Sequence, residues 1–260
     1  MQALSPDLQP YHQLHGAKTS LHPEEGPCFI CEGRFLVESA LEAGLEGKLR
    51  VISLLCQEGL GAEFAPRLPE GTRLLTAGKA ELSELLGFAF HRGVLCCVAV
   101  PPEPDESEIL GARRLVVLPH VDNVENLGLI LRSAAALGMD AVVAGRGPSP
   151  FERRSLRVSM GAAWKLPVVQ REDPGPLLER WRAAAPDSEI VGAALSPAAQ
   201  DARLWQPAAR SALVLGPEAY GLDEAWLHRC DRLIAIPMAK GMDSLNVAAA
   251  GAILMFRMLG

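Results

Sequence analysis

The sequence predicts an α/β protein whose second half forms a mostly parallel sheet, preceded by a smaller α/β unit. Three observations support this fold class. From residue 113 onward, short apolar runs alternate with helix-like segments; several of these runs end in glycine or proline; and a proline-rich acidic stretch separates the two regions. Buried parallel strands are apolar throughout, and their alternation with helices is typical of a sheet covered on both faces.

Composition sets the outer limits of the interpretation. The chain has 260 residues, of which 49% are hydrophobic, and its formal net charge is −6. This apolar content is ample for buried cores. The acidic balance argues against a protein that coats nucleic acid by bulk charge, so an RNA-binding function requires local basic patches. No apolar run reaches the roughly 20 residues of a membrane span, and we expect a soluble, cytoplasmic protein.

The first region begins with residues 1–24, which mix proline, histidine and charged residues without periodicity. We predict an irregular arm there, with His12 and His15 facing solvent. Residues 25–100 predict a compact α/β unit. Its expected elements, in order, are strand Cys28–Glu32, helix Phe35–Ala43, strand Arg50–Cys56, helix Lys79–Leu86 and strand Val94–Val100.

The six cysteines do not predict a disulfide framework, because the chain is long and no signal peptide opens it. Cys28 and Cys31 form a lone Cys-x-x-Cys pair without a second pair at zinc-ribbon spacing. On a strand, an offset of three directs the two sulfurs to opposite faces. We therefore expect reduced thiols and no metal site.

The clearest sign of a domain boundary is the segment from Pro101 to Glu108, whose sequence is Pro-Pro-Glu-Pro-Asp-Glu-Ser-Glu. It predicts a semi-rigid linker over residues 101–112, with a second domain over 113–260. Expected strands of that domain are Leu115–Pro119, Ala141–Ala144, Leu166–Val169, Glu189–Ala194, Ala212–Gly216 and Leu233–Pro237. Expected helices are Asn126–Leu137, Phe151–Ser159, Pro176–Ala184, Asp223–Arg229 and Asn246–Leu259.

Two loops of the second domain are expected to meet at one edge of the sheet. One follows the strand that ends at Gly216, and the other follows the strand that ends at Pro237. Loops beyond the carboxyl ends of parallel strands bind ligands. Gly216 and Gly221 permit sharp turns and close approach of the backbone to a ligand. Ser244 or Asn246 can cap the helix that follows.

These segments resemble signature motifs of the SpoU/TrmH-type RNA 2′-O-ribose methyltransferases of the SPOUT superfamily. The matching stretches occur in family order: Asn126-Leu127-Gly128 with Arg132-Ser133-Ala134, then Leu215–Leu222, then Ile236–Val247. The resemblance implies S-adenosyl-L-methionine as cofactor and methyl transfer to a ribose 2′-hydroxyl of rRNA or tRNA. It also implies a C-terminal trefoil knot and a homodimer through the C-terminal domain, with the active site completed across the interface.

The resemblance also assigns site residues. The expected catalytic residues are Asn126, Arg132, Glu218, Ser244 and Asn246. The expected cofactor-binding residues are Ala194, Leu215, Gly216, Pro217, Gly221, Ile236, Pro237, Met238 and Leu245. Apolar, backbone-rich loops suit a flat adenine, because amides can bond its edges while aliphatic side chains cover its faces. The same aliphatic side chains also suit a plain core, and the two interpretations are compatible.

Arg132 is the residue that we expect to act on the acceptor side. A guanidinium with a pKa above about 12 is a poor base, so phosphate anchoring and stabilisation of a developing alkoxide fit it better. The structural alternative is an ion pair with Glu125 or Glu218. Ser244 and Asn246, taken singly, are more often helix caps. Family members often carry Asp-Pro before the motif asparagine, whereas this chain has Asn123-Val124, with Asp122 out of register.

The region from Cys31 to Glu38, with His91–Val94, resembles the ribosomal-protein-like substrate-binding domain of these enzymes. The expected RNA-binding residues are Arg34, Arg92, Arg153, Arg154 and Arg157, and further candidate phosphate contacts are Lys48, Arg50 and Arg73. The alternative for each of these cations is an ordinary solvated charge.

Two other functions stay open. A noncatalytic RNA-binding protein can retain this fold, and the alternation of strands and helices alone also suits a dinucleotide-dependent oxidoreductase. The second alternative lacks its motif, because Gly145-Arg146-Gly147 is followed by Pro148 and no Gly-x-Gly-x-x-Gly follows an early strand.

Overall fold

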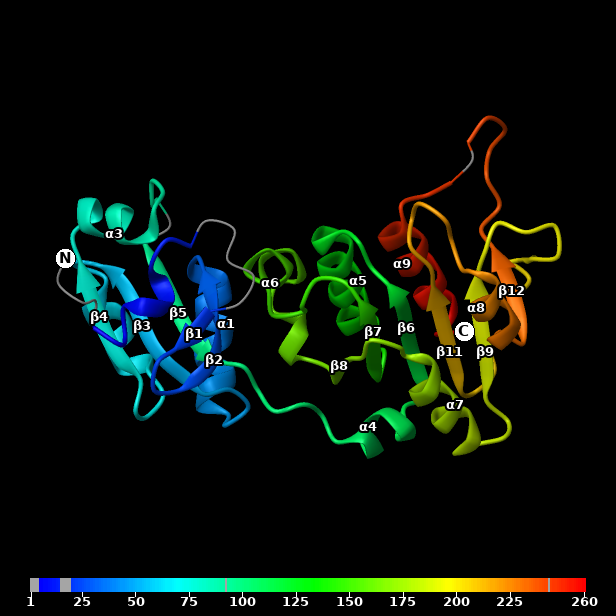
Figure 1. Cartoon of the computed structure of the whole chain (residues 1–260), viewed down its shortest axis with the longest axis horizontal. Helices are drawn as coiled ribbons and strands as arrows, with labels where there is room; N and C mark the ends of the chain where they lie inside the picture. The colour runs from blue at the N-terminus through cyan, green and yellow to red at the C-terminus, as the bar shows by residue number, and fades with distance from the viewer. Residues whose placement is uncertain (1–4, 15–19, 92, 243) are drawn as a thin grey trace. The chain divides into compact units, whose positions relative to one another are not determined.

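The computed structural model describes residues 5–14, 20–91, 93–242 and 244–260 (Figure 1). Its contacts divide the chain into two compact units. Unit 1 comprises Met1–Pro102 together with Ser149–Trp164, and unit 2 comprises Glu103–Pro148 and Lys165–Gly260. The division between them therefore falls at Pro102–Glu103, inside the predicted linker.

Unit 1 is built on a mixed sheet with the strand order β1-β2-β5-β3-β4. The strands are β1 Ser20–His22, β2 Gly26–Glu32, β3 Val51–Gln57, β4 Arg73–Ala77 and β5 Val94–Ala99. The helices are α1 Arg34–Leu45, α2 Gly61–Phe64 and α3 Lys79–Leu86, with short 3₁₀ turns η1 Gln9–Tyr11 and η2 Ala65–Arg67. Every element predicted for residues 25–100 is present, while β1, β4 and α2 were not predicted.

The N-terminal segment is part of this unit, so the prediction of an irregular arm is wrong for its described residues. Tyr11 and Leu14 are buried in the core that α3 covers. The Tyr11 hydroxyl lies 3.0 Å from the carbonyl oxygen of Ser53 and 2.9 Å from its Oγ. Because two isolated apolar residues form no periodic pattern, the burial of Tyr11 and Leu14 could not be predicted from the sequence. His12 is exposed as predicted, and His15 lies outside the described residues.

The segment Ser149–Trp164 packs with unit 1 rather than with the flanking sequence, which differs from the predicted continuous domain over 113–260. It contains α6 Arg153–Ser159 and the turn η3 Ala162–Trp164. Phe29 on β2 stacks on Phe151 and on Trp164, with ring centroids 5.2 and 5.8 Å apart. Aromatic burial of this kind joins segments that are distant in sequence.

Unit 2 holds a sheet with the strand order β10-β12-β9-β11-β6-β7-β8, whose neighbouring strands pair in parallel. The strands are β6 Arg114–His120, β7 Ala141–Arg146, β8 Val168–Gln170, β9 Glu189–Ala193, β10 Gln200–Asp201, β11 Ser211–Leu215 and β12 Arg232–Ala235. The helices are α4 Glu106–Gly111, α5 Val124–Ala136, α7 Gly175–Ala183, α8 Glu224–Arg229 and α9 Val247–Arg257.

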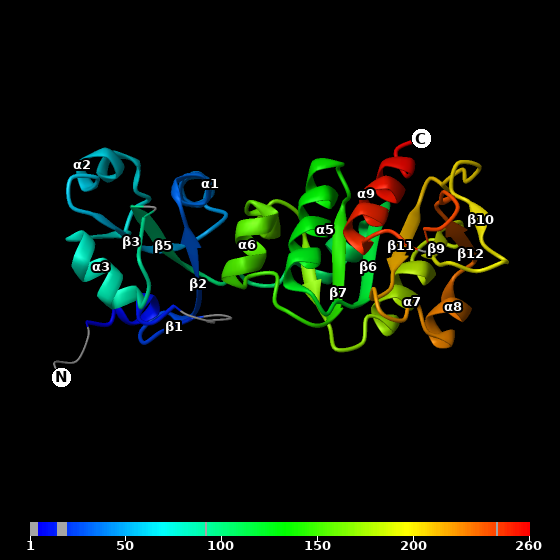
Figure 2. The same cartoon turned by 90° about the horizontal axis from the view of Figure 1, so that it is seen from above.

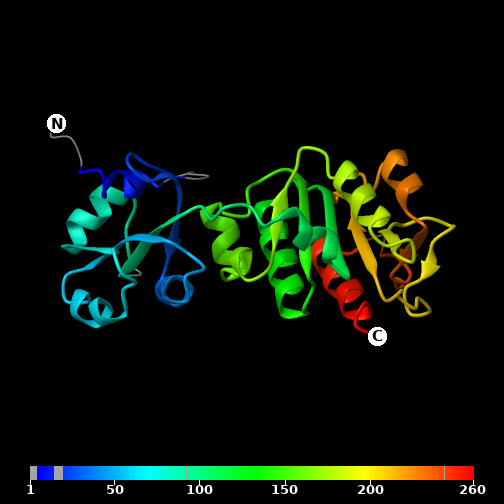
Figure 3. The same cartoon turned by 90° about the horizontal axis from the view of Figure 1, so that it is seen from below.

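Helices cover both faces of this sheet, which confirms the predicted architecture. Figures 2 and 3 show α5 and α9 side by side on one face and α7 and α8 on the other. The core on the α7 side contains Val117 and Trp181, and the indole Nε1 of Trp181 donates to the carbonyl oxygen of Ala112 at 2.8 Å. The carboxyl ends of β6, β9, β11 and β12 all lie at one edge.

Part of the predicted linker is helical, so that prediction is wrong for residues 106–111. Asp105 caps α4: its Oδ1 accepts from the amide of Ser107 at 2.8 Å, while its own amide donates to Glu108 Oε1 at 2.9 Å. Ile109 is fully buried in the core of unit 2. The capping box lies inside an acidic run that resembles a solvated linker.

Cys28 and Cys31 point to opposite faces of β2, as their spacing predicts. Cys28 contacts Cys97 in the core beneath α3, whereas Cys31 contacts Cys96. Among the described residues, no group of three or more His, Cys, Asp or Glu side chains is arranged to hold a metal ion. Within the same residues, no helix has the length and apolar character to cross a membrane.

Candidate active site

A pocket of about 400 Å³ opens in unit 2 where the loops after β9, β11 and β12 meet the start of α9. Its walls are mainly aliphatic side chains and backbone. The predicted cofactor-binding residues that line it are Ala194, Leu215, Gly216, Pro217, Gly221, Ile236, Met238 and Leu245. Pro237 is the one member of that set outside the lining. The loops expected after Gly216 and Pro237 thus form part of this pocket, and the lining residues named here are those that the family resemblance implied.

Gly216 keeps the loop after β11 closed upon itself. A Cβ at this position would lie 2.5 Å from the carbonyl carbon of Gly221 and 2.6 Å from the amide nitrogen of Leu222. Both contacts are with backbone, which cannot swing aside as a flexible side chain would. Residue 216 must therefore be glycine if residues 216–222 are to hold this wall of the pocket.

A hydrogen-bonded set of three side chains lies beside the pocket. Asn246 Nδ2 donates to Asn126 Oδ1 at 3.0 Å and to Glu218 Oε1 at 2.7 Å. Asn246 Oδ1 accepts from the amides of Ala248 and Ala249 at 2.9 and 3.2 Å, and so caps α9. Because the cap requires the oxygen, the nitrogen must face the other two side chains. The cap and the predicted functional role therefore belong to the same amide.

Asn126 does not begin its helix, which corrects the predicted start. Helix α5 begins at Val124, and Asn123 is its cap, with Oδ1 accepting from the amide of Glu125 at 2.7 Å. Asn126 is buried in the first turn, where its side chain reaches Asn246. The residue that departs from the family's Asp-Pro pattern thus serves as a helix cap.

Arg132 and Ser244 are the remaining predicted catalytic residues. Ser244 lines the pocket. Arg132 is exposed on α5 and lines neither this pocket nor the smaller cavity beside Asn126. Among the described residues, no hydrogen bond or ion pair of its guanidinium occurs. The alternative of a pair with Glu218 is wrong, because Asn246 occupies that carboxylate.

The predicted RNA-binding cations of unit 1 are largely engaged by carboxylates. Arg34 pairs with both oxygens of Glu63 and with Glu38, and the Glu63 carboxylate raises the pKa of Arg34. Lys48 pairs with Glu46 at 2.7 Å. Arg92 lies outside the described residues.

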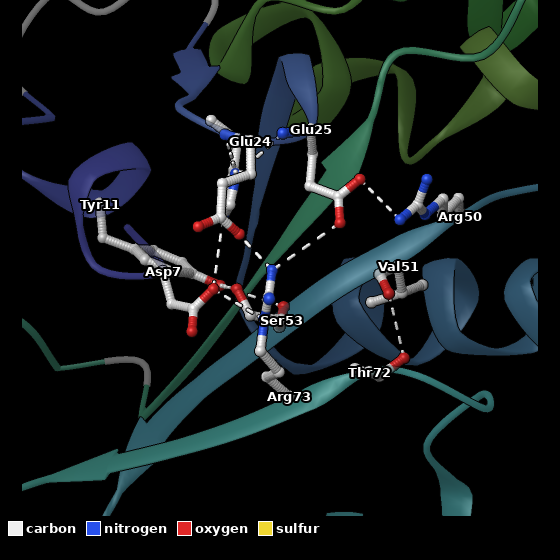
Figure 4. Close-up of polar contacts among 10 residues, drawn as sticks. Asp7, Tyr11, Glu24, Glu25, Arg50, Val51, Ser53, Thr72 and Arg73 are labelled. Atoms are coloured by element: carbon white, nitrogen blue, oxygen red, sulfur yellow. Dashed lines mark hydrogen bonds and ion pairs between the residues drawn. The ribbon is translucent and has the colours of Figure 1, made fainter. Parts of the chain in front are cut away.

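Arg50 and Arg73 are held in the same way (Figure 4). Arg50 Nη2 lies 2.6 Å from Glu25 Oε2, and Arg73 Nε lies 2.7 Å from Asp7 Oδ1. These ion pairs link the segment around β1 to the start of β3 through Arg50 and to β4 through Arg73. For these two cations the structure favours a structural role over phosphate binding.

The arginines of α6 differ among themselves. Arg153 lies 3.5 Å from Glu32 and its guanidinium stacks 5.3 Å from the ring centroid of Phe88, so it is integrated into unit 1. Arg154 and Arg157 are exposed.

One polar pair beside the site was missed by the sequence analysis. His120 ends β6, and its Nε2 lies 2.5 Å from Asp122 Oδ1. Both residues line a small cavity of about 30 Å³ together with Asn126 and Glu218. A histidine followed two residues later by an aspartate, directly after an apolar strand, was the signal available in the sequence.

Comparison with known proteins identifies relatives along most of the chain. The profile of the SpoU rRNA Methylase family matches residues 113–256. The chain is 36% identical over 234 residues to an uncharacterized tRNA/rRNA methyltransferase of Mycobacterium tuberculosis, covering 80% of each protein. It is 29% identical over 236 residues to the 23S rRNA (guanosine(2553)-2′-O)-methyltransferase RlmP of Bacillus subtilis, covering 89% of this chain and 88% of RlmP.

Solved structures with the same fold cover nearly the whole chain. The SpoU methyltransferase AviRb from Streptomyces viridochromogenes, in complex with AdoMet, matches with a TM-score of 0.79 at 23% identity, over 97% of this chain and 96% of AviRb. A structure of an RNA 2′-O ribose methyltransferase matches with a TM-score of 0.73 at 25% identity, over 98% of this chain and 95% of the other. With the family profile spanning the pocket loops and the Asn126, Glu218 and Asn246 set, the chain belongs to the SpoU rRNA Methylase family.

Proposed function

We propose that this protein is an S-adenosyl-L-methionine-dependent methyltransferase that modifies a ribose 2′-hydroxyl of ribosomal RNA. The observation that carries the proposal is the bonded set of Asn126, Glu218 and Asn246 beside an aliphatic pocket. RlmP is named as a 23S rRNA guanosine 2′-O-methyltransferase, which supports ribosomal RNA as the acceptor. Transfer RNA is the other candidate acceptor, because the mycobacterial relative is named a tRNA/rRNA methyltransferase.

The pocket suits the cofactor in size and chemistry. Its volume of about 400 Å³ falls in the usual range for small-molecule sites. The amide of Gly221 donates to the carbonyl oxygen of Pro217 at 2.9 Å, so other backbone groups of the Gly216–Gly221 loop would bond the edges of an adenine, while Leu215, Ile236 and Leu245 can cover its faces. When bound, S-adenosyl-L-methionine supplies an electrophilic methyl group on a sulfonium sulfur.

The protein's own residues then have distinct tasks. Asn246, locked by its cap, joins the start of α9 to Glu218 and Asn126. This holds the pocket wall and the start of α5 in one fixed arrangement at the acceptor side, so little reorganisation is needed when the ribose binds. Ser244, on the pocket lining, is available to the ribose or to a phosphate.

We infer that Arg132 acts in the active site of a second copy of the chain, so that the enzyme is a homodimer. Arg132 is exposed and shares one face of α5 with Leu129, three residues earlier, whose exposed fraction is 41%. Helix α9, which packs against α5, exposes Ile253 and Phe256, and Leu259 is exposed just after the helix ends. An apolar patch across two neighbouring helices is typical of an interface between protein chains. Its burial would carry Arg132 to the partner's ribose and phosphate.

Three further features belong to this proposal. The chain returns from β12, beyond β9, to α9 beside β11 and α5, a path that supports a C-terminal trefoil knot. Unit 1 has a hydrophobic core of its own, which supports its assignment as a separate substrate-binding domain. Arg154 and Arg157 are exposed on α6 of this unit, and we propose that they bind RNA. Work on ribosomal RNA implies a cytoplasmic location.

The test has two steps. Calorimetric titration with S-adenosyl-L-methionine, run beside NAD, is expected to give saturable binding of the first alone. The protein is then incubated with unmodified ribosomal or transfer RNA, and 2′-O-methylated nucleosides are measured by mass spectrometry after digestion. Binding of NAD instead would favour an oxidoreductase. Absence of methylation on either RNA, with RNA binding intact, would favour the noncatalytic alternative.

A further inference from the structure

The pair formed by His120 and Asp122 lies in the same small cavity as Asn126 and Glu218 of the candidate site. His120 follows Leu118 on β6 by two positions, so its side chain shares the face of the sheet that α5 and α9 cover. Its imidazole is partly exposed, at 41%, and Asp122 is 60% exposed. Solvent and an RNA ribose can therefore reach the ring, which a buried structural histidine would not permit.

The small cavity ties this pair to the proposed active site. His120, Asp122, Asn126 and Glu218 all line it, and the Gly216–Pro217 wall is common to this cavity and the larger pocket. The imidazole therefore lines a cavity that shares residues Gly216, Pro217 and Glu218 with the pocket proposed for the cofactor and that also contains Asn126, the partner of Asn246.

We propose that His120 is the group that accepts the proton of the ribose 2′-hydroxyl, with Asp122 as its positioning residue. The proposal rests on the function proposed above. Methylation of a hydroxyl releases a proton, and the chain needs a group that can take it at neutral pH. Arg132 is always protonated, and Glu218 Oε1 already accepts hydrogen bonds from Asn246 and from the amide of Val247. Imidazole titrates in the range that suits a general base.

The geometry of the pair also sets the tautomer. Asp122 is an acceptor, so the Nε2 that faces it at 2.5 Å carries the ring proton. That leaves the lone pair on Nδ1, for which no donor is present among the described residues. A carboxylate that orients a histidine and stabilises its protonated form is the arrangement used by many general bases.

The reaction then balances without another reactant. The ribose oxygen forms its bond to the methyl carbon, the carbon–sulfur bond breaks with its electron pair left on sulfur, and the hydroxyl proton passes to Nδ1 of His120. The sulfonium charge is replaced by an imidazolium charge, which Asp122 faces, and the proton leaves to solvent after product release.

Charged groups around His120 come from each neighbouring element. Asp122 follows on the same loop, and Glu218 stands on the loop after β11. On β7, Arg146 is the register partner of His120, and Glu172 pairs with it at 2.8 Å.

The first experiment compares pH–rate profiles of the full-length protein and its variants on ribosomal RNA. His120→Gln is expected to lower kcat by roughly 10²- to 10⁴-fold and to remove the rising limb of the profile, as loss of a general base does. Calorimetric affinity for S-adenosyl-L-methionine should not change. Asp122→Asn should lower kcat less. His228→Gln, an exposed histidine on α8, is the matched control and should leave kcat unchanged.

Two readouts separate a proton acceptor from a structural residue. Added imidazole should restore part of the activity of His120→Ala in proportion to its concentration. Nitrogen NMR of the wild-type protein, without cofactor, should show the Nε2-protonated tautomer of His120, and Asp122→Asn should weaken that preference.

The outcomes are distinguishable. Wild-type protein that methylates no RNA overturns the proposed function and this proposal with it. Active wild type with an equally active His120→Gln variant overturns only the role of His120. The same holds if His120→Gln loses cofactor affinity in step with activity, if imidazole gives no rescue, or if the ring proton resides on Nδ1.

Discussion

Asn246 shows how one side chain can hold three parts of the molecule together. Its side-chain oxygen accepts a hydrogen bond from a backbone amide at the start of α9. Its side-chain nitrogen donates hydrogen bonds to residues on α5 and on the loop after β11. An aspartate could provide the cap but no donor, and a serine hydroxyl could donate only one of the two hydrogen bonds that Asn246 Nδ2 makes. Asparagine is therefore required at this position by the site and not by the helix alone.

Gly216→Ala is predicted to abolish most cofactor binding. The new Cβ would lie 2.5 Å from the backbone of Gly221, so the loop over residues 216–222 must open and the pocket wall must move. We expect a severe loss of affinity for S-adenosyl-L-methionine by calorimetry. Gly111→Ala is the control, because no atom lies within 4 Å of its added Cβ. Equal affinities of the two variants would show that the loop is not built around Gly216.

At the scale of elements, the N-terminal turn η1 behaves as part of the core of unit 1. Tyr11 is fully buried, and burial is the main cause of the raised pKa of its hydroxyl. The adjoining strand β1 pairs with β2, and Asp7 is fastened to Arg73. The segment therefore stabilises the sheet, although its sequence resembles a loose terminus.

Tyr11→Phe is predicted to destabilise unit 1 by about 1–3 kcal/mol, the cost of leaving the buried Ser53 partners without the phenol. Urea denaturation of the full chain, followed by circular dichroism, measures the change. Leu21→Ala on β1 is the control, because its side chain is 67% exposed. A Tyr11→Phe variant as stable as that control would mean that η1 does not contribute to folding.

The thiol of Cys230, at the end of α8, is predicted to make the free energy of unfolding fall at alkaline pH. Burial, reinforced by the Asp231 carboxylate, raises the pKa of Cys230 to about 11. Below its ordinary pKa of about 8.5 the thiol is neutral in both states and its contribution is complete. As the pH rises from there towards 11, only the unfolded chain ionises, so the free energy of unfolding falls.

Cys230→Ala should therefore lose less stability than the wild type between about pH 8 and about pH 10.5. The urea midpoints of both proteins at the two pH values give the comparison. The other buried groups with raised pKa values, Tyr11, Cys31, Cys56 and Cys97, are common to both proteins, so their effects cancel. Identical pH dependence in the two proteins would contradict the shift.

At the scale of the whole molecule, activity is predicted to depend on pairing of two chains. Phe256 has 64% of its surface exposed on α9, and we propose that it forms one apolar patch with the exposed side chains of Leu129, Ile253 and Leu259. In water this patch costs free energy that a second copy would recover by covering it.

Phe256→Glu is predicted to give a monomer that binds S-adenosyl-L-methionine but does not methylate RNA, because Arg132 no longer reaches the partner's site. Light scattering after gel filtration measures the mass, and the RNA assay measures activity. Phe35→Glu, at 56% exposure on α1, is the matched control and should remain dimeric. A fully active Phe256→Glu monomer would contradict the proposed shared site.

The family resemblance supplied ten of the 22 residues that line the pocket. The sequence by itself determined the parallel sheet and two of the loops that form the pocket. These follow from local patterns: continuous apolar runs mark buried strands, and glycines mark loops where backbone approaches backbone. Tertiary structure alone decided the rest. Asn126 meets Asn246 from 120 positions away, Arg50 and Arg73 are neutralised by Glu25 and Asp7, and Phe151 stacks on Phe29. Such contacts depend on the folded path of the chain, because ion pairs and ring packing between distant segments leave no periodic signature in the residues that make them.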